Sequence, residues 1–482
     1  MMKNKAMRCV WLVCGLLMLA VTSCKDDLLY TDGEPIPEGE TTIIAQVDFR
    51  PLVEGLAGKS RTAGDAIKSI QDLCVLLYDT EGNFVEGHSL ESISNANPTD
   101  GQFYVNEVTR KDGDAPDGGT IAETKTPQAN LKLTIPYGRY YIYAVANMGE
   151  DFKKAVQAHG KENGAAEEVA KYKTAIATKE GLKSISLTWD VADVAKNSQM
   201  FGHFTIVGQE NNSELITINK KGMKLHSWIR RAASKVTIAY DGSKLEEGVF
   251  IYLKSVTIKD IPQNCCLGQD NPAVPENYQP KDRDEGVKLD LIKNGETIKY
   301  YEGDTEPTIS DFKETYEARI TKGKPLFGSK EQGENAYHPK KLADVHTEIT
   351  NALYFYENMQ GKGKEGTPSD KRQVVANTLN KTEPTYPNGG QENNEAWKDA
   401  KPYGTYIEVD AFYVSINDKK VGRGPIKYRF MLGKDVITDY NAERNHHYKL
   451  TLKFKGYAND ADWHIEYEEP EQEHRPVKKN KK

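Results

Sequence analysis

The chain has little cysteine, with six among 482 residues, and their positions exclude two classes of protein. Three of the six precede residue 25, in or directly after an N-terminal apolar segment. Of the others, Cys74 lies in an apolar strand pattern and is interpreted as a small buried hydrophobe. Cys265 and Cys266 are adjacent, a spacing that fits no set of zinc ligands. A disulfide scaffold and a zinc finger are therefore excluded, and the sequence predicts no role for Cys265 and Cys266.

The chain also lacks the motifs of common catalytic and metal sites. It contains no G-x-S-x-G or H-E-x-x-H sequence, and its nearest approach to a P-loop, at 323–330, has the lysine one place late. His446 and His447 begin an expected strand, where adjacent side chains point to opposite faces and cannot easily chelate one ion. We predict no catalytic residue, no metal site and no cofactor. Weak calcium binding by the acidic turn at 112–123 stays open as a minor alternative.

Long basic stripes are missing before the C-terminal tail, and the chain contains 64 Lys and Arg residues compared with 71 Asp and Glu residues. With a formal net charge of −7, nucleic acid is not an expected partner. Tyrosine, in contrast, is plentiful, with 26 residues against 13 phenylalanines. Because tyrosine suits a pleated, half-buried surface, the composition favours β-structure.

Apolar runs long enough to cross a membrane are missing too, since the segment Cys9–Val21 is too short to span a bilayer by itself. Basic residues precede it and Val21-Thr22-Ser23-Cys24 ends it, so residues 1–23 are interpreted as a secretion signal cleaved between Ser23 and Cys24. This ending resembles a lipobox, which predicts that Cys24 is lipidated and anchors the mature chain. An ordinary signal followed by a chance cysteine is the alternative. Residues 24–40 are interpreted as a flexible tether.

Alternation of apolar and polar residues dominates the rest of the chain and predicts strands with one buried face. Ile43, Ala45, Val47 and Phe49 form the apolar face of the first expected strand, at 41–49. The further expected strands lie at 70–78, 131–135, 139–146, 184–189, 200–207, 234–240, 249–260, 405–415, 426–432 and 446–455.

One segment departs from this pattern, because residues 151–178 are predicted to be helical with an interruption near His159-Gly160. Polar stretches at 268–345 and 361–402 are interpreted as long insertion loops. Many strands with few helices predict an all-β fold built from β-sandwiches. We expect an N-terminal domain at 41–222, a C-terminal domain at 223–467 and a polar charged tail at 468–482.

Several short segments carry a resemblance to a known family. Besides the lipobox they are Ile70–Phe84, Tyr140–Met148, Met200–Gly202, Arg231–Val236, Tyr356–Gly361, Gly404–Ser415, Tyr428–Gly433 and Arg444–Tyr448. In this order and spacing they resemble the fimbrillin-like lipoproteins of Bacteroidales, the type V pilin superfamily with a domain-of-unknown-function C-terminal half. The resemblance covers most of residues 24–466. Lys25-Asp26-Asp27 resembles the acidic export signal that follows the lipid-bearing cysteine in lipoproteins of this group.

The resemblance implies two transthyretin-like β-sandwich domains, with the helical segment as a short insertion in the first. It also implies a fimbrial subunit, tip or anchor that is exported as a lipoprotein to the surface of the outer membrane. The implied partners are other fimbrial subunits, through donor-strand exchange, the outer membrane, through the lipid, and host or bacterial surface ligands.

In this family a trypsin-like surface protease cuts stalk subunits after an arginine, and a strand from another subunit then fills the groove of the first strand. The exchanged segment here would be Thr41–Phe49. Arg61, followed by Thr62 in a loop of small residues, is the candidate cleavage site. Arg50 is disfavoured because Pro51 follows it and blocks most trypsin-like cleavage. The alternative for Arg61 is an ordinary surface charge.

The end of the chain departs from the stalk pattern of this family. The tail after Tyr467, EEPEQEHRPVKKNKK, is polar, contains prolines and cannot act as an apolar donor strand. This favours a tip, anchor or accessory subunit. A surface glycan-binding lipoprotein is the alternative function, which exposed coplanar Trp or Tyr side chains would favour. A hydrolase is disfavoured because no nucleophile or acid–base pair is recognisable, so we predict that the chain is not an enzyme.

Overall fold

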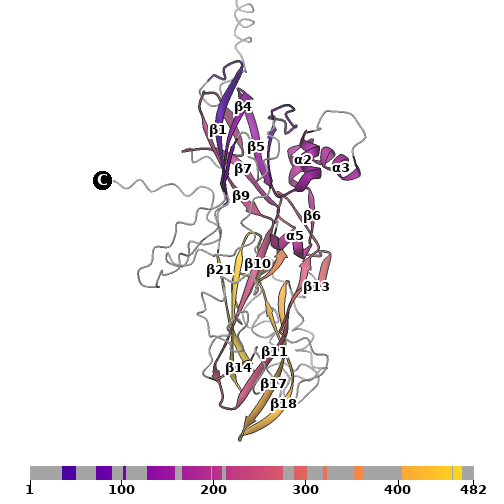
Figure 1. The fold of residues 1–482 in the computed structure, drawn as a ribbon, viewed down its shortest axis with the longest axis vertical. Coiled ribbons are helices and arrows are strands. Elements are labelled where there is room, and N and C mark those ends of the chain that lie inside the picture. Colours follow the sequence, from indigo (N-terminus) through magenta and orange to yellow (C-terminus); the bar gives the residue numbers. More distant parts are fainter. Residues whose placement is uncertain are drawn as a thin grey trace, which may run out of the picture.

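The structure is a computed structural model, and it describes the chain from residue 35 to residue 468 with gaps. The described residues are 35–49, 72–88, 101–104, 128–157, 166–196, 198–208, 213–274, 287–300, 319–322, 352–362, 404–458 and 460–468. Strands far outnumber helices in these ranges, which confirms the predicted all-β fold class. Figure 1 shows an elongated molecule with the first sheet at one end and the strands of the C-terminal part at the other. No helix in the described ranges is long and apolar enough to cross a membrane.

The N-terminal part is built on one eight-stranded sheet, in the order β2-β5-β7-β9-β1-β4-β3, with β8 paired to β5. Its strands are β1 (Glu40–Phe49), β2 (Leu73–Tyr78), β3 (Gly101–Tyr104), β4 (Gln128–Pro136), β5 (Gly138–Ala146), β7 (Met200–Ile206), β8 (Leu215–Ile218) and β9 (Lys224–Arg231). Leu73 of β2 and Ile43 of β1 belong to one core cluster, although three strands separate them in the sheet. The sheet therefore curls around its own apolar face.

The helices lie between β5 and β7 and cover the outer face of β2 and β5. They are α2 (Gly149–Gln157), α3 (Glu167–Ile176), α4 (Lys179–Lys183) and α5 (Val191–Lys196), with the short strand β6 (Ser186–Thr188) between the last two. Helix α2 buries Phe152, Ala155 and Val156, which helical spacing places on one face. The backbone N–H groups of Met148, just before the helix, and of Gly149, its first residue, donate to the Asp72 carboxylate, which caps the helix next to β2.

The C-terminal part is a sandwich of two sheets around a second core. The first sheet, in the order β15-β10-β20-β21, consists of β10 (Ala233–Leu245), β15 (Ala352–Tyr356), β20 (His447–Gly456) and β21 (Asp460–Glu468). The second, in the order β13-β11-β17-β18 with β14 paired to β11, consists of β11 (Val249–Pro262), β13 (Leu291–Lys299), β14 (Arg319–Thr321), β17 (Tyr406–Asn417) and β18 (Lys420–Met431).

Two short ladders complete the fold. Strand β12 (Asn264–Cys266) pairs with β6, and β16 (Asn358–Lys362) pairs with β19 (Asp439–Ala442). The β6–β12 ladder joins the two parts of the chain. A third core cluster lies at the same junction and mixes side chains of both parts, such as Tyr143 of β5, Phe152 of α2, Cys265 of β12 and Tyr354 of β15.

Every strand range expected from the alternation contains a strand of the structure, and the helical prediction at 151–178 corresponds to α2 and α3. Residues 158–165, which include the expected interruption, lie outside the described residues. The interpretation of 268–345 as loop alone is wrong, because β13 and β14 fall within it. None of the β13 side chains is fully buried, so the strand needs no regular apolar face. Its sequence therefore lacks the alternation of apolar and polar residues from which strands are predicted.

Strand β9 lies after the expected domain boundary at 222/223, yet it pairs with β1 and β7. Leu225 and Ile229 of β9 belong to the N-terminal core. Gly202 of β7 allows this pairing to be close, since a Cβ there would lie 2.3 Å from the carbonyl oxygen of Trp228. Strand β9 ends at Arg231 and β10 begins at Ala233, so the chain passes from the first sheet to the second across Ala232.

A buried carboxylate organises the charged face of the second sheet. The Glu408 side chain is 2% exposed and contacts Lys259 at 2.8 Å, Lys427 at 3.1 Å and Arg429 at 2.7 Å. Burial opposes ionisation of Glu408, but the hydrogen bonds from Lys259 and Arg429 and the nearby positive charges outweigh it and lower the pKa to about 2. The cross-strand contacts tie β11, β17 and β18 together through one anion.

We expect Glu408→Gln to lower the free energy of unfolding at neutral pH by about 3 kcal/mol, because the carboxylate is stabilised in the folded state. A lowered folded-state pKa stabilises the fold above the unfolded pKa of about 4.5, and this contribution is lost as the pH falls toward 2. The difference between wild type and variant should therefore shrink from pH 5 to pH 2 in urea titrations. Glu38→Gln, at an exposed site, is the control, and a difference that is constant with pH would contradict this assignment.

Candidate functional site

Strand β1 occupies an interior position in the first sheet, with a neighbour on each side. It pairs antiparallel with β4 from Glu40 to Asp48 and parallel with β9 from Ile44 to Phe49. Figure 1 shows β1 beside β4 at the end of the molecule opposite the β17–β18 hairpin. An N-terminal strand that is hydrogen-bonded along both edges has a slot of its own, with β4 as one wall and β9 as the other.

The apolar face of β1 lies in the N-terminal core. Ile43, Ala45 and Val47 are each 0% exposed, and they share the core cluster with Leu73, Val75 and Leu77 of β2. Ile44 points the other way and is 49% exposed. The alternation along β1 therefore sets its register, since a slip by one residue would bring Ile44 into the core and Ile43 to the surface.

The remaining predicted site residues fall outside the described part of the chain. The signal cleavage and lipidation positions Ser23 and Cys24 precede residue 35, and the candidate processing pair Arg61 and Thr62 lies in 50–71. Phe49 is placed by its backbone in β1, but its side chain is outside the described set. The described parts of the slot are therefore the side chains of Ile43, Ala45 and Val47 and the neighbouring strands β4 and β9.

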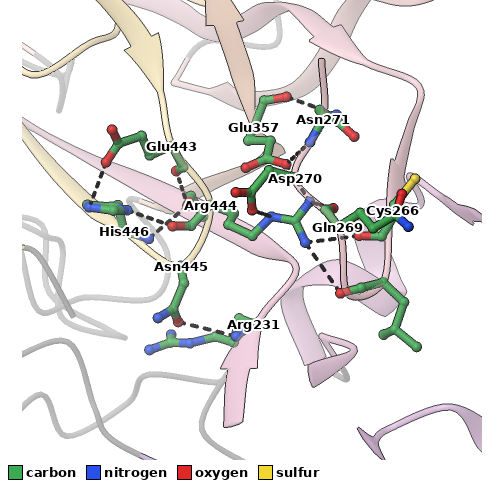
Figure 2. Close-up of polar contacts among 12 residues, drawn as sticks. Arg231, Cys266, Gln269, Asp270, Asn271, Glu357, Glu443, Arg444, Asn445 and His446 are labelled. Carbon is green, nitrogen blue, oxygen red and sulfur yellow. Dashed lines mark hydrogen bonds and ion pairs between the residues drawn. The ribbon is translucent and has the colours of Figure 1, made fainter. Parts of the chain in front are cut away.

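A second set of residues forms a polar network at the junction between the two parts, shown in Figure 2. The Arg444 guanidinium donates to the carbonyl oxygens of Cys266 at 2.9 Å and Gln269 at 2.7 Å, and it forms an ion pair with Glu357. Glu357 also accepts a hydrogen bond from the backbone N–H of Asn271. One arginine therefore connects the segment before β20, the residue between β15 and β16, and the loop that follows β12.

Burial makes this network sensitive to the loss of either partner. The Arg444 side chain is 11% exposed and the Glu357 side chain 3%. Burial opposes the charge on Arg444, but the hydrogen bond and the charge of Glu357 outweigh it and raise the pKa of the guanidinium. Next to it, the side-chain oxygen of Asn445 accepts a hydrogen bond from the backbone N–H of Arg231, where β9 ends. The network thus reaches the strand that forms one wall of the β1 slot.

Sequence reasoning missed this pairing although it had singled out both segments. Glu357 lies in the motif at 356–361 and Arg444 in the motif at 444–448, but 87 positions separate them and no spacing rule connects them. Cys265, for which no role was predicted, packs in the junction core, where burial raises the pKa of its thiol. His447 is buried and its Nε2 lies 2.8 Å from the Thr237 hydroxyl, while the His446 Nε2 lies 3.2 Å from Glu443.

The described residues were compared with the geometry of a metal site. No group of three or more His, Cys, Asp or Glu side chains in the described ranges is arranged to hold a metal ion.

Two tryptophans bear on the alternative of glycan binding. Trp228 of β9 is half buried beside His226, with ring centroids 4.5 Å apart. Trp189 instead lies at the junction, where its indole N–H donates to the carbonyl oxygen of Tyr354. These two tryptophans lie in different environments and form no common stacking face.

Comparison with known families assigns a domain to the C-terminal part. Residues 353–452, from β15 into β20, match the family described as a domain of unknown function, DUF4906. This match confirms the domain of unknown function that the sequence resemblance placed in the C-terminal half. No curated protein matches the chain.

Several solved structures similar to the chain are described as cell adhesion or fimbrial proteins. A protein from Parabacteroides distasonis, provisionally assigned to cell adhesion, is 10% identical, with 91% of this chain and 99% of that chain covered and a TM-score of 0.39. A fimbrilin (fimA) from Porphyromonas gingivalis W83 is 10% identical, with coverages of 88% and 97% and a TM-score of 0.37. The tip fimbrial protein Mfa3 from Porphyromonas gingivalis is 10% identical, with coverages of 89% and 98% and a TM-score of 0.35.

The neighbouring isoleucines of β1 test its register directly. We expect Ile43→Ala to lower the free energy of unfolding by about 2–4 kcal/mol, because it opens a cavity in the core. Ile44→Ala, the matched control on the other face, should change it by less than about 0.5 kcal/mol. Chemical denaturation of both variants measures the difference. Equal effects at the two positions would contradict the register described here.

Removing one partner of the junction ion pair should be costly. We expect Arg444→Met to lower the free energy of unfolding by about 3–5 kcal/mol, since it leaves the Glu357 carboxylate buried without its cation. The double variant Arg444→Met/Glu357→Leu should lose less than the sum of the two single variants, because neither charge is then left alone. Arg230→Met, at an exposed position of β9, is the control. Strict additivity in denaturant titrations would show that the two side chains act independently.

Proposed function

We propose that the chain is a surface fimbrial subunit, or an accessory tip or anchor pilin, with a structural and adhesive role and no catalysis. In this proposal, the precursor is exported as a lipoprotein and carries lipid on Cys24 at the outer membrane, and the chain then assembles with other fimbrial subunits by strand exchange at β1. It consists of two β-sandwich domains. The support comes from the ordered motifs of the sequence, the DUF4906 match and, above all, the position of β1.

The observation that carries the proposal is an interior strand close to the beginning of the mature chain. Removing β1 would leave the β4 and β9 edges unpaired and would open the core positions of Ile43, Ala45 and Val47. Unpaired edges beside apolar pockets form a template for an added strand. A strand from another subunit with the same alternation would restore both the hydrogen bonds and the buried surface.

Cleavage alone would not empty the slot. Each fully buried Val or Ile side chain contributes about 1.5–3 kcal/mol, and Ile43 and Val47 are both 0% exposed. Together with the ladder to both neighbours, this is a large share of the usual 5–15 kcal/mol of a folded domain. A cut after Arg61 would therefore leave β1 bound without a covalent link, until a competing strand displaces it.

The slot also sets requirements for the donor strand. It must run parallel to β9 and antiparallel to β4, and it must place a small residue at the position of Ala45, whose partners are Leu131 and Leu225. A larger residue there would overpack the core. The residues at 468–482 have no such pattern, so in this proposal they are not the donor strand.

Strand exchange can be tested with a chain in which a site-specific protease sequence replaces residues 58–64. After cleavage, the chain is incubated with a labelled peptide of the β1 sequence Glu40–Phe49, and native mass spectrometry follows its uptake. We expect β1 to stay bound after cleavage and then to be replaced by the peptide in a one-to-one ratio over hours. The uncut chain should take up none, because its own strand is tethered.

The matched control is a peptide of the same composition in which the apolar residues are moved to the opposite face. It should not be taken up, because a one-residue shift of the pattern places polar side chains in the core. Equal uptake of both peptides would show that the slot does not select for the alternation of apolar and polar residues, and would contradict the proposal. Spontaneous loss of β1 with a folded chain left behind would contradict the proposal as a whole.

A further inference from the structure

Two buried hydroxyl groups at the β1 slot have no hydrogen-bond partner among the described residues. Ser227 of β9 is 1% exposed and Thr41 of β1 is 4% exposed, and the side-chain oxygens of both are enclosed. A buried hydroxyl without a partner destabilises the fold, because it loses its hydrogen bonds to water and gains none inside the protein. At these two positions, therefore, the slot and the strand that occupies it do not match.

The first mismatch lies in a wall of the slot, where Ser227 interrupts an apolar row of β9. Leu225 and Ile229, two positions before and after it, are buried in the N-terminal core. The register partner of Ser227 in β1 is Val47, and its partner in β7 is Phe204. The wall thus presents a hydroxyl to a strand that answers it with an aliphatic side chain.

The Ser227 hydroxyl has room to turn toward β1. Its Oγ lies beside Gly202 of β7, where a Cβ would come within 3.0 Å of it. Rotation about the Cα–Cβ bond to another staggered position turns the hydroxyl away from β7 and toward the strand on the other side. Hydroxyl pairs between register partners occur elsewhere in this molecule, since the side-chain oxygens of Thr257 and Thr297 lie 2.9 Å apart across β11 and β13.

The second mismatch lies on β1 itself, at its first inward residue. Thr41 is the register partner of Ile135 in β4, which is fully buried. Thr42, which points to the other face, has its hydroxyl 3.4 Å from that of Thr134. The inward threonine therefore places a hydroxyl next to an apolar neighbour, where a valine of nearly the same shape would place a methyl group.

From these two mismatches we infer that the slot selects a donor strand with the inward pattern Val-x-Ile-x-Ala-x-Thr over the resident pattern Thr-x-Ile-x-Ala-x-Val. A threonine at position 47 of the strand pairs with Ser227, and an aliphatic side chain at position 41 removes the buried hydroxyl. Strand β1 is then the weaker of two occupants, which gives exchange a direction. The inference rests on the proposed strand exchange and adds Ser227 as the residue that selects the donor.

The preference at position 41 can be measured on the uncut chain, where no exchange takes place. We expect Thr41→Val to raise the equilibrium constant for folding about tenfold, because it removes a buried hydroxyl at nearly constant shape. Thr42→Val is the matched control, and it should not raise the constant, since its hydroxyl is paired with that of Thr134. Denaturant titrations give both values. An unchanged or lower constant for Thr41→Val would overturn the preference for an aliphatic residue.

A double-mutant cycle of Val47→Thr with Ser227→Ala tests the preference at position 47, again on the uncut chain. We expect Val47→Thr alone to raise the folding constant about threefold, because one hydrogen bond then satisfies both hydroxyls. In the Ser227→Ala chain, the same substitution buries a hydroxyl without a partner and should lower the constant about tenfold. Opposite signs in the two backgrounds support the inference. The same effect in both, as expected if a buried water satisfies Ser227 instead, would overturn it.

The chain cut between β1 and β2 supplies the second arm of the test. A labelled β1 peptide with Thr41→Val and Val47→Thr should bind about 30-fold more tightly than the unchanged peptide, if the two effects add. In the Ser227→Ala chain, threonine at position 47 should weaken binding. Equal binding of the two peptides to the unsubstituted slot would overturn the inference and leave strand exchange intact. Opposite signs in the unfolding cycle without uptake of either peptide would overturn strand exchange and leave the preferred pattern of the slot established.

Discussion

The burial of β1 between β4 and β9 is the constraint on which the N-terminal part depends. Ile43, Ala45 and Val47 connect β2 with β4 across the interior of the curled sheet, because they pack against the apolar faces of both. Without them, β4 and β3 would have no ladder to the rest of the sheet. A single strand of ten residues thus closes the core, and the same property makes it suitable for exchange.

The junction connects this slot to the C-terminal sandwich. Strand β9, one wall of the slot, passes into β10 across Ala232, and β10 lies between β15 and β20 in the second part. The same junction is also stabilised by the shared core, by the β6–β12 ladder and by the ion pair of Arg444 with Glu357. The two sandwiches are therefore coupled through packed apolar surface and a buried ion pair, and a strand seated beside β9 would be joined to the whole molecule.

Local alternation predicted the strands whose two faces differ clearly, such as β1, β4 and β20, and helical spacing predicted α2 and α3. It failed for β13, whose side chains are all at least partly exposed, and for the short strands β12 and β16, which other segments hold in place. The buried face of β1 could be read from residues 43–49, because a period of two fixes it. The ion pair of Glu357 with Arg444 could not be predicted, since it depends on the path of the chain through several intervening strands.

If β1 is a replaceable strand, it should be missing from the covalent chain of the subunit once that subunit is assembled on the cell surface. The measurement is N-terminal sequencing of this subunit from purified surface fimbriae, with the cell-bound precursor beside it. We expect a precursor that contains residues 41–49 and an assembled subunit that begins at Thr62. An assembled subunit that still carries residues 41–49 in its own covalent chain would contradict strand exchange at β1.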